Sequence, residues 1–156
     1  MRGKRKFAGI LLLILSIIIV QLPVSKADAK TSASDFIVQS GKLIKYQGSS
    51  SNVTIPDSVD TVGKSAFENN SKVEHVVIPK SVKRIEAYAF WNCTNLTNVS
   101  VGSGMMEISD FAFANCHGLT QMVLPDNIKY IGIDAFQDCV NLTDITIPPE
   151  TIDIHE

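Results

Sequence analysis

Residues 78–100 read IPKSVKRIEAYAFWNCTNLTNVS, and residues 101–123 repeat the same pattern as VGSGMMEISDFAFANCHGLTQMV. The dipeptide Ala-Phe marks the register of this repeat, because it recurs at a constant spacing of 23 residues. A fixed period of this length predicts a solenoid, in which copies of one small unit stack into a rod. The four pairs are Ala66-Phe67, Ala89-Phe90, Ala112-Phe113 and Ala135-Phe136.

Each copy contains the apolar pattern L-x-x-L-x-L, as at Leu96, Val99 and Val101. The last two apolar residues alternate with polar ones, which is typical of a half-buried strand. We therefore expect one strand in each copy, and stacking of the copies then forms a parallel sheet. A second apolar group follows, as at Val82 and Ile85. Its spacing predicts a short second strand or a tight turn, and then a one-turn helix at Ala-Phe.

The unit I-P-x-x-V-x-x-I-x-x-x-A-F-x-x-C-x-x-L-T-x-V resembles the BspA-like subfamily of leucine-rich repeats, which occurs on bacterial surface and secreted proteins. Residues 36–54 precede the repeats and resemble the N-terminal cap of that family. Ser40-Gly41 separates two apolar runs in this segment and predicts a hairpin turn. Residues 55–156 then contain four copies and an incomplete last one. The resemblance implies a protein-binding, adhesin-like module.

Residues 1–29 have the pattern of a secretory signal peptide. Basic residues at the start precede an apolar run of 14 residues, and Ala27-Asp28-Ala29 fits the cleavage pattern, which predicts a mature start at Lys30. An uncleaved anchor is the alternative, although a bilayer span needs about 20 apolar residues. We expect a secreted or cell-surface protein, in which residues 30–35 are a short polar leader and the mature chain does not insert into a membrane.

The charge of the chain narrows the range of partners. Residues 1–29 hold five of the fourteen basic residues but only one of the sixteen acidic residues. The remainder therefore has nine basic and fifteen acidic residues, and its net charge is −6. An acidic chain disfavours nucleic acid and anionic membranes as partners. We expect an extracellular protein instead, such as a host or matrix protein.

Two registers of the repeat predict columns of buried side chains. One holds the phenylalanines and the other holds cysteines. Three cysteines without a C-x-x-C motif favour buried free thiols over a metal site, and a disulfide remains the alternative. Cys116 is followed by His117, but sequence neighbours rarely face each other in an active site. The columns comprise Phe67, Phe90, Phe113 and Phe136, and Cys93, Cys116 and Cys139.

The sequence has no motif that points to catalysis. It lacks a glycine-rich phosphate loop, a nucleophile elbow and an HExxH motif, and no pair of carboxylates recurs with the separation of a glycosidase. We therefore expect a binding protein without cofactor or metal, and not an enzyme. Two alternatives stay open, namely the repeat region of a longer secreted enzyme and a truncated remnant of a larger surface protein.

The x positions of the strand pattern point outward and predict a binding face. This face is small and polar, it is rich in threonine, and it contains no aromatic residue. The alternative is a solvated face in which threonine serves only as a good strand former. The twelve residues are Glu74, His75, Val77, Thr97, Asn98, Ser100, Thr120, Gln121, Val123, Thr143, Asp144 and Thr146.

The last copy begins at Ile147-Pro148 and does not reach an Ala-Phe pair. Solenoids usually need a polar capping unit at each end, and no such unit is evident after the last copy. Three expectations follow from this pattern. The gene product is truncated, or residues 148–156 fold over the open end, or two open ends meet in an end-to-end dimer.

Overall fold

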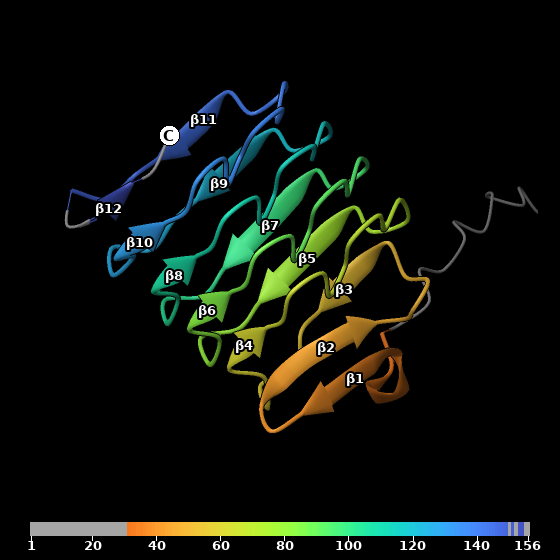
Figure 1. The fold of residues 1–156 in the computed structure, drawn as a ribbon. Coiled ribbons are helices and arrows are strands. Elements are labelled where there is room, and N and C mark those ends of the chain that lie inside the picture. The colour runs from red at the N-terminus through yellow and green to blue at the C-terminus, as the bar shows by residue number, and fades with distance from the viewer. Residues whose placement is uncertain (1–30, 150, 152, 155–156) are drawn as a thin grey trace, which may run out of the picture.

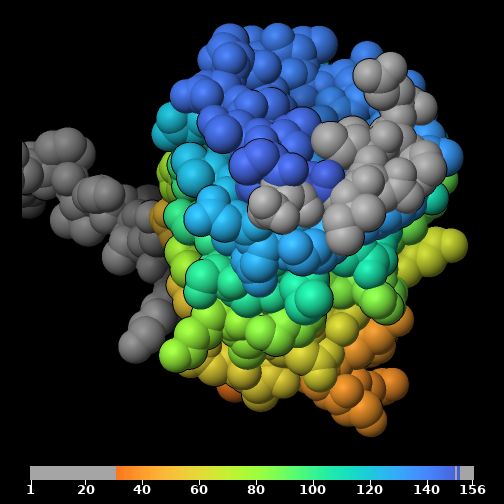
Figure 2. All heavy atoms as spheres, turned by 90° about the vertical axis from the view of Figure 1, so that its left-hand side faces the viewer, coloured from red at the N-terminus to blue at the C-terminus, as the bar shows by residue number. Residues whose placement is uncertain are grey.

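The computed structural model describes residues 31–149, 151 and 153–154, so the predicted signal peptide lies outside the described residues. The chain winds through successive coils that stack along one axis, with a hairpin at one end (Figure 1). Viewed from the side, the coils follow one another as stacked bands (Figure 2). A 3-10 turn, η1 (Ala33–Asp35), precedes the strands. The strands are β1 (Phe36–Gln39), β2 (Lys42–Tyr46), β3 (Asn52–Thr54), β4 (Thr61–Val62), β5 (His75–Ile78), β6 (Arg84–Ile85), β7 (Asn98–Val101), β8 (Glu107–Ile108), β9 (Gln121–Val123), β10 (Tyr130–Ile131), β11 (Asp144–Thr146) and β12 (Asp153–Ile154).

One sheet contains the longer strand of each coil in the order β3-β5-β7-β9-β11, and we call it the long-strand sheet. Its strands are parallel, and residues that are 23 positions apart lie opposite each other, as Val76 with Val99 and Val99 with Met122. The sequence period is therefore the strand register. This confirms the predicted parallel solenoid, in which apolar residues such as Val76 face the core and their neighbours face outward.

The second sheet runs in the order β1-β2-β4-β6-β8-β10-β12, and we call it the short-strand sheet because its repeat strands have two residues each. It follows the same register, so that Ile85 lies opposite Ile108. Of the two predictions for this segment, a short strand and a tight turn, the strand is confirmed. Ile85 and Ile108 are fully buried and, together with the inward residues of the long-strand sheet, they belong to one continuous apolar core.

The Ala-Phe segment forms consecutive turns, and the predicted one-turn helix is absent there. Tyr88 and Asn92 adopt positive φ of 60° and 57°, which interrupts a right-handed helix. The N–H of Phe90 donates to the carbonyl of Ala112 in the next coil at 2.8 Å and not to its own turn. The N–H groups of Ala89 and Trp91 donate within the turn, so bonds within the turn alternate with bonds to the next coil. The same two registers have positive φ in the other coils, at Ser65, Asn69, Phe111, Asn115, Asp134 and Asp138.

The phenylalanines of the Ala-Phe pairs stack in one column inside the rod. The ring centroids are 4.7 Å apart for Phe67 and Phe90, and 4.9 Å apart for Phe90 and Phe113. Phe136 continues the column at 5.5 Å from Phe113, but it is only partly buried, whereas the other three are fully buried. The stacking of the aromatic column is therefore loosest at Phe136, its last described member.

The cysteines form a second column, and each thiol donates a hydrogen bond to a backbone carbonyl in the preceding coil. All three cysteines are buried and free, and no disulfide joins them. The sulfur therefore acts as a small apolar group that also satisfies a buried carbonyl oxygen. The bonds run from Cys93 to Phe67 at 3.1 Å, from Cys116 to Phe90 at 3.1 Å and from Cys139 to Phe113 at 3.2 Å.

The hairpin of β1 and β2 caps the N-terminal end of the described rod, which confirms the predicted hairpin cap. Ser40 and Gly41 both have positive φ, as the tight turn of a two-residue hairpin requires. Strand β2 pairs in parallel with β4, so the hairpin belongs to the short-strand sheet. The ring of Tyr46 lies 4.9 Å from that of Phe67 and extends the aromatic column into the cap.

Candidate binding surface

The outer side of the long-strand sheet carries the twelve residues of the predicted face. They form three columns along the rod, because equivalent residues of successive coils pair across the strands. The amide column contains His75, Asn98, Gln121 and Asp144, and the valine column contains Val77, Ser100, Val123 and Thr146. The threonine column precedes the strands and contains Glu74, Thr97, Thr120 and Thr143.

The threonine column is bonded within the fold. The hydroxyl of Thr97 donates to the backbone carbonyl of Glu74 at 3.0 Å. In the same way, the hydroxyls of Thr120 and Thr143 donate to the backbone carbonyl of the threonine one coil earlier, at 3.4 and 3.5 Å. The backbone N–H groups of the same residues donate to the same carbonyls. These threonines therefore stabilise the stacking of coils, which leaves the amide and valine columns as the better candidates for ligand contact.

The amide and valine columns form an accessible and nearly uncharged surface. Val123 is 76% exposed and Val77 is 45% exposed, although both are apolar. The side-chain amides of Asn98 and Gln121 lie opposite each other and make no side-chain hydrogen bond within the described residues. Asp144 is the single carboxylate of the two columns. The surface therefore offers hydrogen bonds and apolar contact with little charge.

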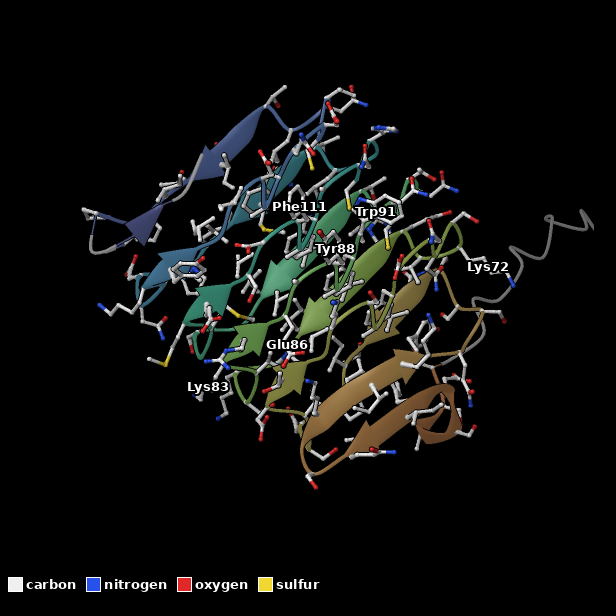
Figure 3. All side chains as sticks on the ribbon, viewed as in Figure 1. Lys72, Lys83, Glu86, Tyr88, Trp91 and Phe111 are labelled. Atoms are coloured by element: carbon white, nitrogen blue, oxygen red, sulfur yellow. The ribbon has the colours of Figure 1, made fainter. Side chains whose placement is uncertain are left out.

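A group of aromatic residues outside the predicted face was missed by sequence reasoning. Tyr88 and Phe111 lie on the turns that follow the short strands, and their rings stack at 5.3 Å with an angle of 3° between the planes (Figure 3). Lys64 Nζ lies 5.9 Å from the centre of the Tyr88 ring. Trp91 comes from the same turn as Tyr88 (Figure 3). The signal for this group is the residue before each Ala-Phe pair, which is aromatic in two adjacent copies.

The short-strand sheet differs from the candidate surface because ion pairs cross its outer side. Lys42 Nζ lies 2.7 Å from a Glu86 carboxylate oxygen and ties the hairpin to the second coil, and Arg84 Nε lies 2.8 Å from Glu107. Burial alone would raise the pKa of Glu86. Hydrogen bonds from Lys42 and from the Lys64 N–H, together with the charges of Lys42 and Arg84, lower this pKa below its usual value.

The Cys93 and Cys116 thiols are not placed for nucleophilic chemistry. Burial raises the pKa of Cys93 to about 12, and contact with the Cys139 thiol together with burial raises the pKa of Cys116. A thiol must ionise to act as a nucleophile, so Cys93 and Cys116 stay protonated and unreactive at neutral pH. Contact with the Cys116 thiol lowers the pKa of Cys139, which is the least buried of the three. No three His, Cys, Asp or Glu side chains cluster as metal ligands in the part of the chain that the structure describes. Within the same residues, no helix has the length and apolar character to cross a membrane.

The two-layer parallel rod and its L-x-x-L-x-L strands define a leucine-rich repeat solenoid. The chain belongs to the BspA type leucine rich repeat family, whose model matches six copies over residues 42–156. The match begins in β2, before the first copy predicted from the sequence. The reason is structural, because Leu43 pairs with Val62 and Tyr46 occupies the place of a phenylalanine in the aromatic column.

Solved structures of bacterial leucine-rich repeat proteins share this fold. TpLRR of T. pallidum is 27% identical with a TM-score of 0.66, over 77% of this chain and 72% of that chain. The pneumococcal vaccine antigen PcpA is 23% identical with a TM-score of 0.69, over 74% of this chain and 29% of that chain. A leucine rich cell surface protein from Faecalibacterium prausnitzii is 25% identical with a TM-score of 0.51, over 78% and 43% of the two chains. No curated protein matches the sequence.

Proposed function

We propose that this chain is a secreted or surface-displayed protein that binds an extracellular protein through the long-strand sheet. The observation that carries the proposal is the pair of exposed columns on this sheet, whose side chains the fold itself uses little. The signal-peptide pattern of residues 1–29 supports export. The F. prausnitzii relative, described as a cell surface protein, supports the same location.

The proposed module acts by binding and not by catalysis. Equivalent side chains recur at every coil, about 4.8 Å apart along the rod, so a partner can make several weak contacts of the same kind. The surface is almost uncharged, so apolar contact and hydrogen bonds contribute more to the affinity than ion pairs do. A host or matrix protein is the expected partner, and its binding would make the chain adhesin-like.

The test measures binding of the full chain to a panel of immobilised extracellular matrix proteins. A face variant combines His75→Glu, Val77→Glu and Thr146→Glu, which places three negative charges on the exposed columns. We avoid the threonine column, because its hydroxyls stabilise the stacking of coils. The expected result is that the face variant loses binding while its thermal unfolding is unchanged.

The matched control adds the same charge elsewhere. Met106→Glu, Ile133→Glu and Val140→Glu change residues that are exposed but lie outside the long-strand sheet. This control variant is expected to bind as the unmodified chain does. Equal binding by the face and control variants would show that the long-strand sheet is not the interaction surface.

A further inference from the structure

The corner that follows β7 departs from the repeat. Gly102 stands where the neighbouring coils have Pro79 and Pro125, and Gly104 follows two residues later. A Cβ atom on Gly102 would lie 2.6 Å from the backbone nitrogen of Lys80, and one on Gly104 would collide with the Lys80 carbonyl oxygen. The two glycines therefore allow the corner of the third coil to lie against the corner of the second coil.

A hollow of about 340 Å³ opens on the outer side of the long-strand sheet between β7 and β9. Strands β5 and β7 pair as far as Val101, but the pairing of β7 with β9 ends one residue earlier, at Ser100. The residues that line the hollow are Asn98, Val99, Ser100, Val101, Gln121, Val123, Leu124 and Pro125, of which Val99 and Leu124 belong to the buried core.

Two side-chain amides at one end of the hollow are available for hydrogen bonds. Asn98 and Gln121 make none from their side chains within the described residues, whereas the amides of Asn95 and Asn141 donate to backbone carbonyls at 2.7 Å. An amide offers both a donor and an acceptor, which is the complement of a backbone peptide group. The hollow is therefore equipped to bond the main chain of an extended peptide.

The rest of the lining selects against other ligands. None of the lining residues is charged, so the hollow offers no partner for an ionic ligand. None is aromatic, so a sugar ring would find no ring to stack on. Val123 and Pro125 supply apolar surface instead, and a volume of about 300 Å³ or more is typical of a ligand pocket. An aliphatic side chain fits this combination of polar and apolar groups.

We propose that the hollow between β7 and β9 binds an extended, uncharged peptide segment of a partner protein. One apolar side chain of the segment enters against Val123 and Pro125, and its backbone bonds to Asn98 and Gln121. The inference rests on the proposed function and deepens it, because it names the anchor point of the long-strand sheet and the chemistry of the partner segment.

The test uses a random peptide library displayed on phage as the probe, selected on the full chain. The selected peptides are expected to be uncharged and to contain an aliphatic residue. Ser100→Tyr fills the hollow and is expected to lower the affinity for these peptides at least about tenfold. Thr54→Tyr is the matched control, because Thr54 is exposed at the same register on β3, outside the hollow. This control is expected to leave the affinity unchanged within about twofold.

A second variant separates the amide contacts from the shape of the hollow. Gln121→Leu keeps much of the side-chain volume and removes the hydrogen-bonding group, so peptide affinity should fall while thermal unfolding is unchanged. Equal affinity for the Ser100→Tyr and Thr54→Tyr variants overturns the inference, as does a library that contains no binder. Selective binding of neutral oligosaccharides in place of peptides also overturns it.

The two proposals fail in different ways. The face variant can lose binding to matrix proteins while Ser100→Tyr leaves the peptide affinity unchanged. This result would refute the peptide site in the hollow and support the proposed function. Ser100→Tyr can instead weaken peptide binding while the face variant binds matrix proteins as the unmodified chain does. This result would support the peptide site in the hollow and refute the proposed function.

Discussion

The interior coils and the last two described coils share one sequence pattern, but they bury it to different extents. Phe113 is fully buried, whereas Phe136, one coil further on, is only partly buried. Met122 and Ile145 pair at the same register and differ in the same way. The comparison shows that in a stacked fold each coil is buried by the coil that follows it. A residue's contribution to stability therefore depends on its coil as well as on its type.

The largest expected effect is at the centre of the aromatic column. Phe113 lies between two rings, at 4.9 Å from Phe90 and 5.5 Å from Phe136. We expect Phe113→Ala to lower the free energy of unfolding by about 3–5 kcal/mol, because it opens a cavity between two coils. Urea unfolding followed by circular dichroism measures this loss. A loss below about 1 kcal/mol would show that the column is not the main contact between coils.

The same substitution at the last Ala-Phe pair sharpens the comparison. Phe136 is partly exposed and stacks on Phe113 alone within the described residues. We expect Phe136→Ala to cost about half as much as Phe113→Ala, because less buried surface is lost. The two variants are compared in parallel urea titrations. Equal losses would contradict the account of burial by the following coil.

The cysteine column predicts a smaller effect. Cys116→Ala removes a fully buried side chain and leaves the carbonyl of Phe90 without its thiol donor. We expect a loss of about 1–2 kcal/mol, and a smaller loss for Cys139→Ala, since Cys139 is 9% exposed. A thiol reagent applied to the native chain should modify Cys139 before Cys93 and Cys116. Modification of all three at one rate would indicate global unfolding and no difference between coils.

The smallest effect is expected at the opposite end, where Lys42 of the hairpin pairs with Glu86. Ion pairs as exposed as this one contribute at most about 1 kcal/mol, so Glu86→Gln should destabilise the chain by no more than that at neutral pH. Because the pKa of Glu86 is lowered in the folded state, its contribution is present above the pKa of the unfolded carboxyl and is lost as the pH falls through the folded value.

Thermal unfolding at pH 7 and at pH 3 measures this contribution. The difference between the unmodified chain and Glu86→Gln is expected at pH 7 and should be smaller at pH 3. Glu68→Gln is the control, because Glu68 makes no ion pair within the described residues. A difference of the same size at both pH values would show that the ion pair is not its source.

The repeat is what made the fold predictable from the sequence. A constant spacing of 23 residues places Val76 beside Val99 without knowledge of any dihedral angle. The turn geometry could not be predicted in this way. Tyr88 and Phe111 adopt positive φ, which bulky residues disfavour, because hydrogen bonds to the next coil outweigh their local preference. The spacing of the apolar residues predicted a one-turn helix at the Ala-Phe pairs, and this prediction was wrong because hydrogen bonds to the next coil hold the segment in turns.

The candidate surface was predictable only in outline. Alternation within the strand placed residues such as Gln121 and Val123 on one outer face. It did not reveal that the hydroxyl of Thr97 is bonded within the fold, since that depends on the carbonyl of the preceding coil. The hollow is lined by residues of two neighbouring strands, so the pattern within one copy of the repeat does not reveal it. The sequence shows only that glycine stands at position 102, where the neighbouring copies have proline.

The free thiols have a consequence for how the protein matures. Because Cys93, Cys116 and Cys139 are occupied as hydrogen-bond donors to backbone carbonyls, the native fold has no need of oxidation. Its assembly is independent of disulfide-forming and disulfide-isomerising enzymes, in contrast to small exported domains that rely on crosslinks. The chain should thus unfold at the same temperature with and without a reducing agent. The same fold is then expected in reducing and in oxidising surroundings.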